Sequence, residues 1–153
     1  VPQSIFLCDG TLKENIAFGI DHKNIDNKLL EKAISLAELS SFVATLPENV
    51  DTSLGERGVQ LSGGQQQRVG IARALYHDPE ILIFDEATSS LDDDTEKNIM
   101  NAINKFSRLK TIIIIAHRTN TLKKCDNIFI FDQGRVIDSG NFKSLFENNN
   151  KIN

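Results

Sequence analysis

Two short apolar segments constrain the fold of this chain more than any other feature. Ile81–Asp85 and Thr111–Ala116 consist almost entirely of apolar residues, and polar side chains, Glu86 and His117, follow them directly. A segment with helical periodicity, Asp93–Phe106, separates the two. Apolar strands joined through a helix are typical of a parallel sheet that is buried on both faces. We therefore expect an α/β fold in which both segments are buried parallel strands.

A third strand and a hairpin are expected after this unit. Ile128–Phe131 is again apolar, and the turn residues 132–134 lead into Arg135–Ile137. A short final helix is expected from about Asn141, and the polar tail 148–153 is expected to fray.

The first half of the chain has a helical pattern. Asp26 is a suitable N-cap, and one apolar stripe extends from it to the residue before Pro47. The residues of this stripe are Leu30, Ala33, Ile34, Ala37 and Val43. A loop rich in glycine and charge follows at residues 51–58. The sheet is therefore expected to follow a mostly helical insert.

Leu61–Gln65 is the strongest local signal. Ser62 and Gln65 have the spacing of a capping box, which predicts a helix that runs to about Tyr76 and ends before Pro79. Two glycines follow the cap, where free N–H groups and the helix dipole favour an anion such as phosphate. The alternative is an ordinary capping box with glycines for tight packing.

Acidic residues at the end of the first strand form a second signal. Ligands of open α/β sheets bind at the carboxyl ends of the strands. Asp85 is suited to hold Mg²⁺, directly or through water, and Glu86 is suited to polarise an attacking water. The alternative is a strand end with solvated acids.

Three further signals are weak when taken singly. His117 closes the second strand, where a lone histidine is more often a packing residue. Gln3 follows a proline, as a loop residue would, and Ser90–Asp92 fits an N-cap and its flank.

Composition excludes several classes of protein. The net charge of −4 and the pI of about 5.4 leave no basic surface for nucleic acid, which is not expected as a partner. Cys8 and Cys125 lie far apart, without the spacing of a zinc site or a disulfide framework. The longest apolar runs are far shorter than the roughly 20 residues that cross a bilayer.

In their order along the chain, these segments resemble the nucleotide-binding domain of the ATP-binding cassette (ABC) transporters, over residues 3–146. The combination of LSGGQ with an apolar strand that ends in Asp-Glu is highly specific. The resemblance implies a P-loop NTPase (RecA-like) core with a parallel sheet and a helical subdomain. It also implies the following correspondence: Gln3 with the Q-loop glutamine, Leu61–Gln65 with the signature, Asp85 with the Walker B aspartate, Glu86 with the catalytic glutamate, Ser90–Asp92 with the D-loop, and His117 with the switch histidine.

The resemblance further implies ATP and Mg²⁺ as ligands. In that family two domains pair head to tail and enclose two ATP molecules, so a second nucleotide-binding domain is an expected partner. The expected ATP-binding residues are Ser62, Gly63, Gly64, Gln65 and Asp92; the expected catalytic residues are Glu86, His117 and Gln3; the expected metal-binding residues are Asp85 and Gln3.

Two segments resemble the exporter branch of the family. Thr52–Gly58 is similar to the X-loop that precedes the signature, and Gly10–Ile16 is similar to the exporter segment after the Q-loop. In exporters this region receives the coupling helices of the transmembrane domains, which implies a location at the cytoplasmic face of the inner membrane. The alternatives are a soluble ABC ATPase of the DNA-repair or translation type, and an inactive remnant or partner-binding module.

One family motif is absent from these 153 residues. No G-x-x-x-x-G-K-[ST] occurs, because Lys110 and Lys143, which precede Thr and Ser, follow Leu109 and Phe142 rather than glycine. We therefore expect a partial domain that begins at the Q-loop and lacks the Walker A strand, loop and helix. Its expected parts are a helical and signature subdomain at about 4–78, a Walker B and switch-histidine part at 79–147, and the tail 148–153.

Two consequences are expected for the isolated chain. It should be inactive as an ATPase, because the family's phosphate-binding loop is missing. It should also be poorly soluble, because the strand Thr111–Ala116 would lose a neighbour and present an open apolar edge.

Overall fold

The computed structural model describes residues 1–54, 59–88, 90–106 and 110–147. They form two compact units, Val1–Ile115 and Ala116–Asn153, and each is described by itself. The expected tail 148–153 and residues 55–58 of the expected X-loop lie outside the described residues. The expected division near residue 78, between subdomains of different role, stays a prediction.

The first unit contains the predicted parallel sheet. Strands β3 (Ile81–Asp85) and β4 (Thr111–Ile115) pair in parallel along their whole length. The backbone of Val1 extends this sheet on the other side of β3. Its nitrogen donates to the Ile83 carbonyl (2.7 Å), and its carbonyl accepts from the Asp85 N–H (2.9 Å), which is the pattern of a parallel neighbour. The α/β fold class is confirmed.

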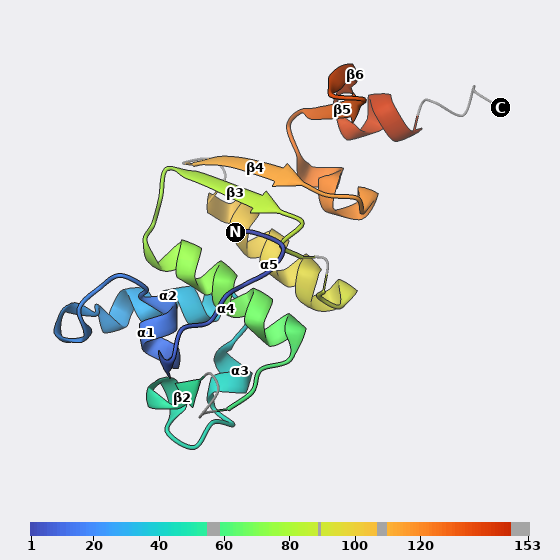
Figure 1. Ribbon diagram of the computed structural model, residues 1–153. Coiled ribbons are helices and arrows are strands. Elements are labelled where there is room, and N and C mark those ends of the chain that lie inside the picture. The colour runs from blue at the N-terminus through green and yellow to red at the C-terminus, as the bar shows by residue number, and fades with distance from the viewer. Residues whose placement is uncertain (55–58, 89, 107–109, 148–153) are drawn as a thin grey trace. The chain divides into compact units, whose positions relative to one another are not determined.

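One face of this sheet is open, so the prediction of strands buried on both faces is wrong. Side chains alternate between the two faces of a strand. Leu82 and Phe84 are 3% and 1% exposed, whereas the side chains on the opposite face are between 47% and 58% exposed: Ile81, Ile83, Ile113 and Ile115. Helices α4 (Gly63–Tyr76) and α5 (Asp93–Phe106) lie against the buried face (Figure 1).

The apolar stripe after Asp26 forms two helices, not the single helix that its periodicity predicts. Helix α2 (Asn27–Leu36) begins as expected, since the Asp26 carboxylate accepts from the N–H groups of its first turn. The chain then turns at Glu38, which has a φ of 56°, and α3 (Ser40–Val43) follows.

The break after α2 has a tertiary cause. The Leu39 N–H donates to the Ile34 carbonyl (3.0 Å), which is the six-residue closure of a Schellman ending. Glycine is usual at the left-handed position of this motif. Here it is Glu38, and its carbonyl accepts from Arg68 Nη1 of α4 (2.9 Å). A contact 30 residues away thus supports a turn that local preference disfavours.

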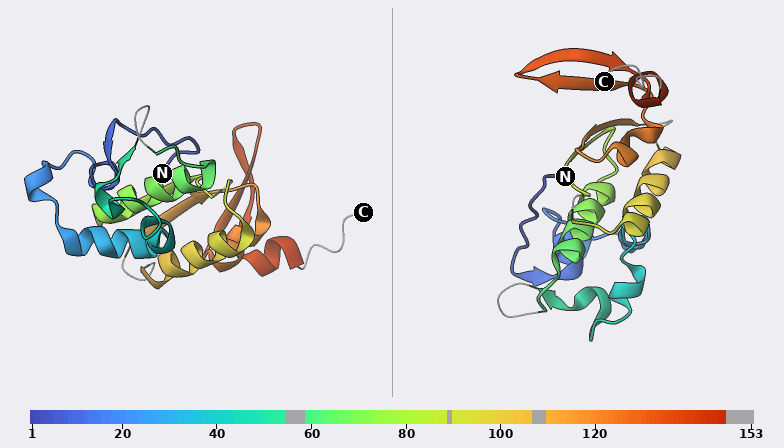
Figure 2. Two further views of the ribbon diagram at one scale, coloured as in Figure 1. Left: turned by 90° about the horizontal axis from the view of Figure 1, so that it is seen from below. Right: turned by 90° about the vertical axis from the view of Figure 1, so that its right-hand side faces the viewer.

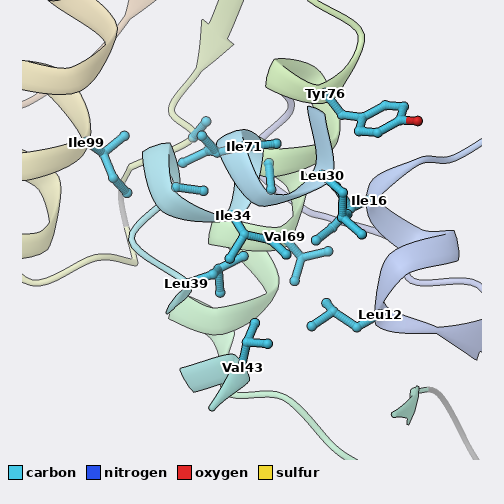
Figure 3. Packing of buried hydrophobic residues seen from close by; sticks show 14 of the residues in the cluster. Leu12, Ile16, Leu30, Ile34, Leu39, Val43, Val69, Ile71, Tyr76 and Ile99 are labelled. Carbon is cyan, nitrogen blue, oxygen red and sulfur yellow. The ribbon is translucent and has the colours of Figure 1, made fainter. Parts of the chain in front are cut away.

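The hydrophobic core of the first unit lies where its helices meet (Figure 3). Leu12 and Ile16 of α1 (Leu12–Ile16), Leu30 of α2, and Val69 of α4 are at most 2% exposed. Ile99 of α5 is fully buried as well. This packing holds α4, which begins with the predicted capping box, in the centre of the unit.

The segment before β1 runs along α4 (Figure 2). A Cβ atom at Gly70 of α4 would lie 2.3 Å from Ile5 Cδ1, so glycine permits the close approach of the segment at this point. Arg73 Nη2 donates to the Phe6 carbonyl (3.1 Å) further along the helix. The N-terminal residues are therefore held against the helix that carries LSGGQ.

Several short elements complete the first unit. Strand β1 (Gly10–Thr11) pairs antiparallel with β2 (Ser53–Leu54), and 3-10 helices form at His22–Asn24 and Asn49–Asp51. Sequence periodicity did not predict these elements, because none is long enough to show a period.

The second unit contains the predicted hairpin. Strands β5 (Ile128–Asp132) and β6 (Arg135–Gly140) pair antiparallel, and both turn residues, Gln133 and Gly134, have positive φ as a type I′ turn requires. Strand β6 is three residues longer than predicted. A 3-10 helix at Thr119–Lys124 precedes the hairpin, and the expected final helix is a π-helix at Lys143–Glu147.

The capping box of α1 predicts a pKa effect. The Thr11 N–H and hydroxyl both donate to Glu14 Oε2 (2.8 Å each), which lowers the pKa of Glu14. This stabilisation is complete above the unfolded-state pKa and is lost as pH falls through the folded-state pKa. Thr11→Val removes the hydroxyl donor, so we expect the Glu14 pKa to rise towards its ordinary value in an NMR titration. An unchanged pKa would contradict the assignment.

Candidate active site

The N-terminus of α4 forms one side of the candidate site. The Gln65 N–H donates to Ser62 Oγ (3.3 Å) and the Ser62 N–H donates to Gln65 Oε1 (2.8 Å), so the predicted capping box is present. A Cβ atom at Gly63 would meet no described heavy atom within 4 Å, whereas one at Gly64 would lie 3.4 Å from the Ser90 carbonyl. The helix end is thus open at Gly63, and an anion can reach its backbone there.

The end of β3 forms the other side. Glu86 has a φ of 50°, and its N–H donates to the Ile115 carbonyl of β4 (3.0 Å). Its carboxylate oxygen Oε2 accepts from Gln3 Nε2 (3.0 Å). The structure therefore brings together two of the residues predicted to be catalytic, although 83 positions separate them.

The residues at this strand end suit Mg²⁺ bound with a phosphate ligand. In the described part of the chain, no group of three or more His, Cys, Asp or Glu side chains is placed to hold a metal ion. Asp85 is exposed at the end of β3, next to Glu86. Mg²⁺ is usually bound through one or two carboxylates together with waters and substrate phosphates. The exposed carboxylate of Asp85 is a ligand of this kind.

The structure shows the positions of two further predicted site residues, but their roles at the site stay predictions. Asp92 Oδ1 accepts from the Thr95 N–H (2.9 Å) at the start of α5, and this hydrogen bond lowers the pKa of Asp92. This is the N-cap role that its sequence position also allowed. His117 follows β4 and belongs to the second unit, so its role beside Glu86 stays a prediction.

Sequence reasoning missed Gln67, which lies between the parts of the site. Its side chain is 3% exposed. Nε2 donates to the carbonyls of Gln3 (3.3 Å) and Glu86 (3.4 Å), and Oε1 accepts from the N–H of Ser90 (3.0 Å). The available signal was its position four residues after Gly63, one turn along the same face of the helix.

The exporter-like segment Gly10–Ile16 lies against residues 52–54 of the other one. Through the pairing of β1 with β2, Gly10 is opposite Leu54, and the Leu12 N–H also donates to the Thr52 carbonyl (3.0 Å). A second capping box, at Thr11 and Glu14, was also missed, although its T-x-x-E spacing is visible in the sequence.

Asn15 anchors this region to the signature helix. It is 1% exposed, its Oδ1 accepts from the Cys8 N–H (2.9 Å), and its carbonyl accepts from Arg73 Nε of α4 (2.8 Å). The exporter-like segments and LSGGQ are thus connected through one buried asparagine.

The fold and the site together define a class of protein: an α/β domain with an acidic end to a parallel strand and, beside it, a helix that is capped by serine and begins with two glycines. The sequence pattern of the family described as "ABC transporter" matches residues 2–89. The chain belongs to the ABC transporter family.

Similar proteins support this assignment. The chain is 45% identical over 148 residues to "ABC multidrug transporter mdr1" of Aspergillus fumigatus, which covers 97% of this chain and 11% of that protein. It is 43% identical over 152 residues to "Heterocyst differentiation ATP-binding protein HepA" of Nostoc sp., covering 99% and 25% respectively.

The chain is also similar to a solved structure, that of a bacterial Atm1-family ABC exporter with ATP bound. The match covers 95% of this chain and 25% of the exporter chain, with a TM-score of 0.86 and 40% sequence identity. The chain thus spans between 11% and 25% of the length of these proteins. In its described part, no helix is both long and apolar enough to cross a membrane.

Proposed function

We propose that the full-length protein hydrolyses ATP to drive export or lipid flipping across a membrane. This chain would supply the signature and the hydrolytic residues of its nucleotide-binding domain. The observation that carries the proposal is the hydrogen bond between Gln3 and the Glu86 carboxylate at the end of β3. The names of two similar proteins, a multidrug transporter and an ABC exporter, support the same proposal.

In the proposed mechanism Glu86 is the general base. Its carboxylate accepts a proton from the attacking water, while Gln3, already hydrogen-bonded to it, orients the carboxylate and the water. Asp85 and Gln3 would hold Mg²⁺, which would neutralise phosphate charge when bound. His117 donates to the γ-phosphate. As in other phosphoryl transfers, positioning and electrostatics supply most of the rate enhancement.

The signature acts on the ATP molecule of a partner domain. The backbone N–H groups of Gly63 and Gly64 and the Ser62 hydroxyl would receive a phosphate at the start of α4, where the space beside Gly63 is open. Gln65 and Asp92 complete this contact between two domains that pair head to tail. The β1–β2 region receives the coupling helices of the transmembrane domains, at the cytoplasmic face of the membrane.

The isolated chain is proposed to be inactive. Its 153 residues contain no phosphate-binding loop motif, so ATP has no high-affinity site within them. The residues described above contribute to hydrolysis only beside a phosphate-binding loop.

Membrane vesicles that contain the full-length protein test the function. We expect Mg-ATP hydrolysis in the membrane fraction, and its loss when EDTA removes Mg²⁺. Hydrolysis that is found only in the soluble fraction would favour a soluble ABC ATPase of the DNA-repair or translation type. A protein that is folded but hydrolyses no ATP in either fraction would favour an inactive remnant or a partner-binding module.

A further inference from the structure

We infer that Gln67 is a positioning residue for hydrolysis, which fixes the backbone on both sides of the Gln3–Glu86 contact to the signature helix. The inference rests on the proposed function. It concerns a residue outside the set that the sequence motifs assign to the site.

The contacts of Gln67 use the full hydrogen-bonding capacity of its side chain. An amide group has two donor hydrogens and one oxygen with two lone pairs. Nε2 donates to the carbonyls of Gln3 and Glu86, and Oε1 accepts from both the N–H and the hydroxyl of Ser90. Because a backbone N–H can only donate, the Ser90 amide also sets which way the Gln67 amide faces.

The backbone of Glu86 needs such support. A φ of 50° is sparsely populated by residues other than glycine, and it persists only where the surroundings hold it. The Glu86 N–H is held by the Ile115 carbonyl, and its own carbonyl is held by Gln67. Gln67 also holds the carbonyl of Gln3, whose side chain donates to the Glu86 carboxylate.

Packing alone does not account for this arrangement. An apolar side chain of similar size would fill the same buried volume, since Gln67 is only 3% exposed. It would leave the Gln3 carbonyl, the Glu86 carbonyl and the Ser90 N–H without the partners they have now. The four contacts connect α4 to the Q-loop, to the strand end and to the segment before α5 at one point.

Two substitutions in the full-length protein separate the contacts. Gln67→Glu keeps the acceptor for Ser90 but loses both donors while the carboxyl is ionised; Gln67→Leu loses all four contacts. Both should lower kcat for ATP about 10- to 100-fold, since misplacement of a reacting group by about 1 Å has that effect. The KM for ATP should change less than about twofold, because the phosphate-binding loop lies elsewhere.

The comparison of kcat with KM gives a readout that a loss of folding alone would not produce, because it separates the positioning of the reacting groups from the binding of ATP. Gln66→Glu is the matched control, since the Gln66 side chain donates to the Leu61 carbonyl (3.4 Å) and not to Gln3 or Glu86, and we expect its kcat to stay within about twofold.

Hydrogen exchange at the Ser90 amide tests the contacts without any activity. Exchange should accelerate in Gln67→Leu and stay slow in Gln67→Glu. An unchanged kcat in both Gln67 variants, or equal loss in the Gln66→Glu control, would overturn the inference.

The two measurements also separate this inference from the proposed function. If the wild-type protein hydrolyses no ATP, the proposed function fails, and the positioning role of Gln67 fails with it. If exchange at the Ser90 amide is unchanged in Gln67→Leu, the contacts of Gln67 themselves are wrong.

Discussion

Glu86→Gln in the full-length protein is expected to lower Mg-ATP turnover at least about 100-fold, the loss typical for removal of a general base. Glutamine has nearly the same size and its Oε1 can still accept from Gln3 Nε2, so the strand end should keep its geometry. An amide cannot take a proton from water at neutral pH. Turnover should therefore fall while ATP binding persists, which equilibrium binding and hydrolysis assays measure side by side.

The control for this variant is Glu31→Gln, an exposed carboxylate on α2. It changes the net charge by the same amount and should leave turnover within about twofold. Hydrolysis that is unchanged in Glu86→Gln would assign the proton transfer to a different base.

Leu30→Ala is expected to lower the free energy of unfolding of the helices in the first unit by about 2–5 kcal/mol. Leu30 is 2% exposed and lies among Ile16, Val69 and Tyr76 in the core (Figure 3). Its truncation leaves a cavity that three helices cannot close without moving. Native-state hydrogen exchange of the α4 amides in the full-length protein measures the loss.

The neighbouring residue provides a matched control. Leu29 is 39% exposed, so Leu29→Ala should cost less than about 1 kcal/mol at the same helix positions. Equal losses in the two variants would mean that the inward face of α2 is assigned wrongly.

Local signals were sufficient to predict most of the fold. The N-cap of Asp26, the capping box at Ser62 and the turn before Arg135 are each specified within four residues, and each is present. The end of α2 could not be predicted in this way, because Glu38 occupies a left-handed position that Arg68 supports from another helix.

The open face of β3 and β4 shows a different limit. The strands that contain Ile81 and Ile113 are as apolar as strands that are covered on both faces, so their composition alone predicts that both faces are buried. Both side chains are nevertheless exposed. Burial depends on which segments are present to cover a face. The apolar runs therefore predicted the positions of the strands correctly, but they predicted the burial of both strand faces incorrectly.

The candidate site was predictable in its residue types but not in its connections. Motif order identified Gln3 and Glu86, and the sheet extension through Val1 explains how the two come within 3.0 Å. Gln67 belongs to none of these motifs. It was not predicted because its contacts, with Gln3, Glu86 and Ser90, form only when three distant segments are folded together.

Mg-ATP turnover, measured side by side for the full-length protein and for the isolated 153-residue chain, tests the central claim most directly. We predict turnover by the full-length protein that depends on Glu86, and none by the isolated chain. Turnover by the isolated chain would contradict the claim, because hydrolysis would then proceed without a phosphate-binding loop.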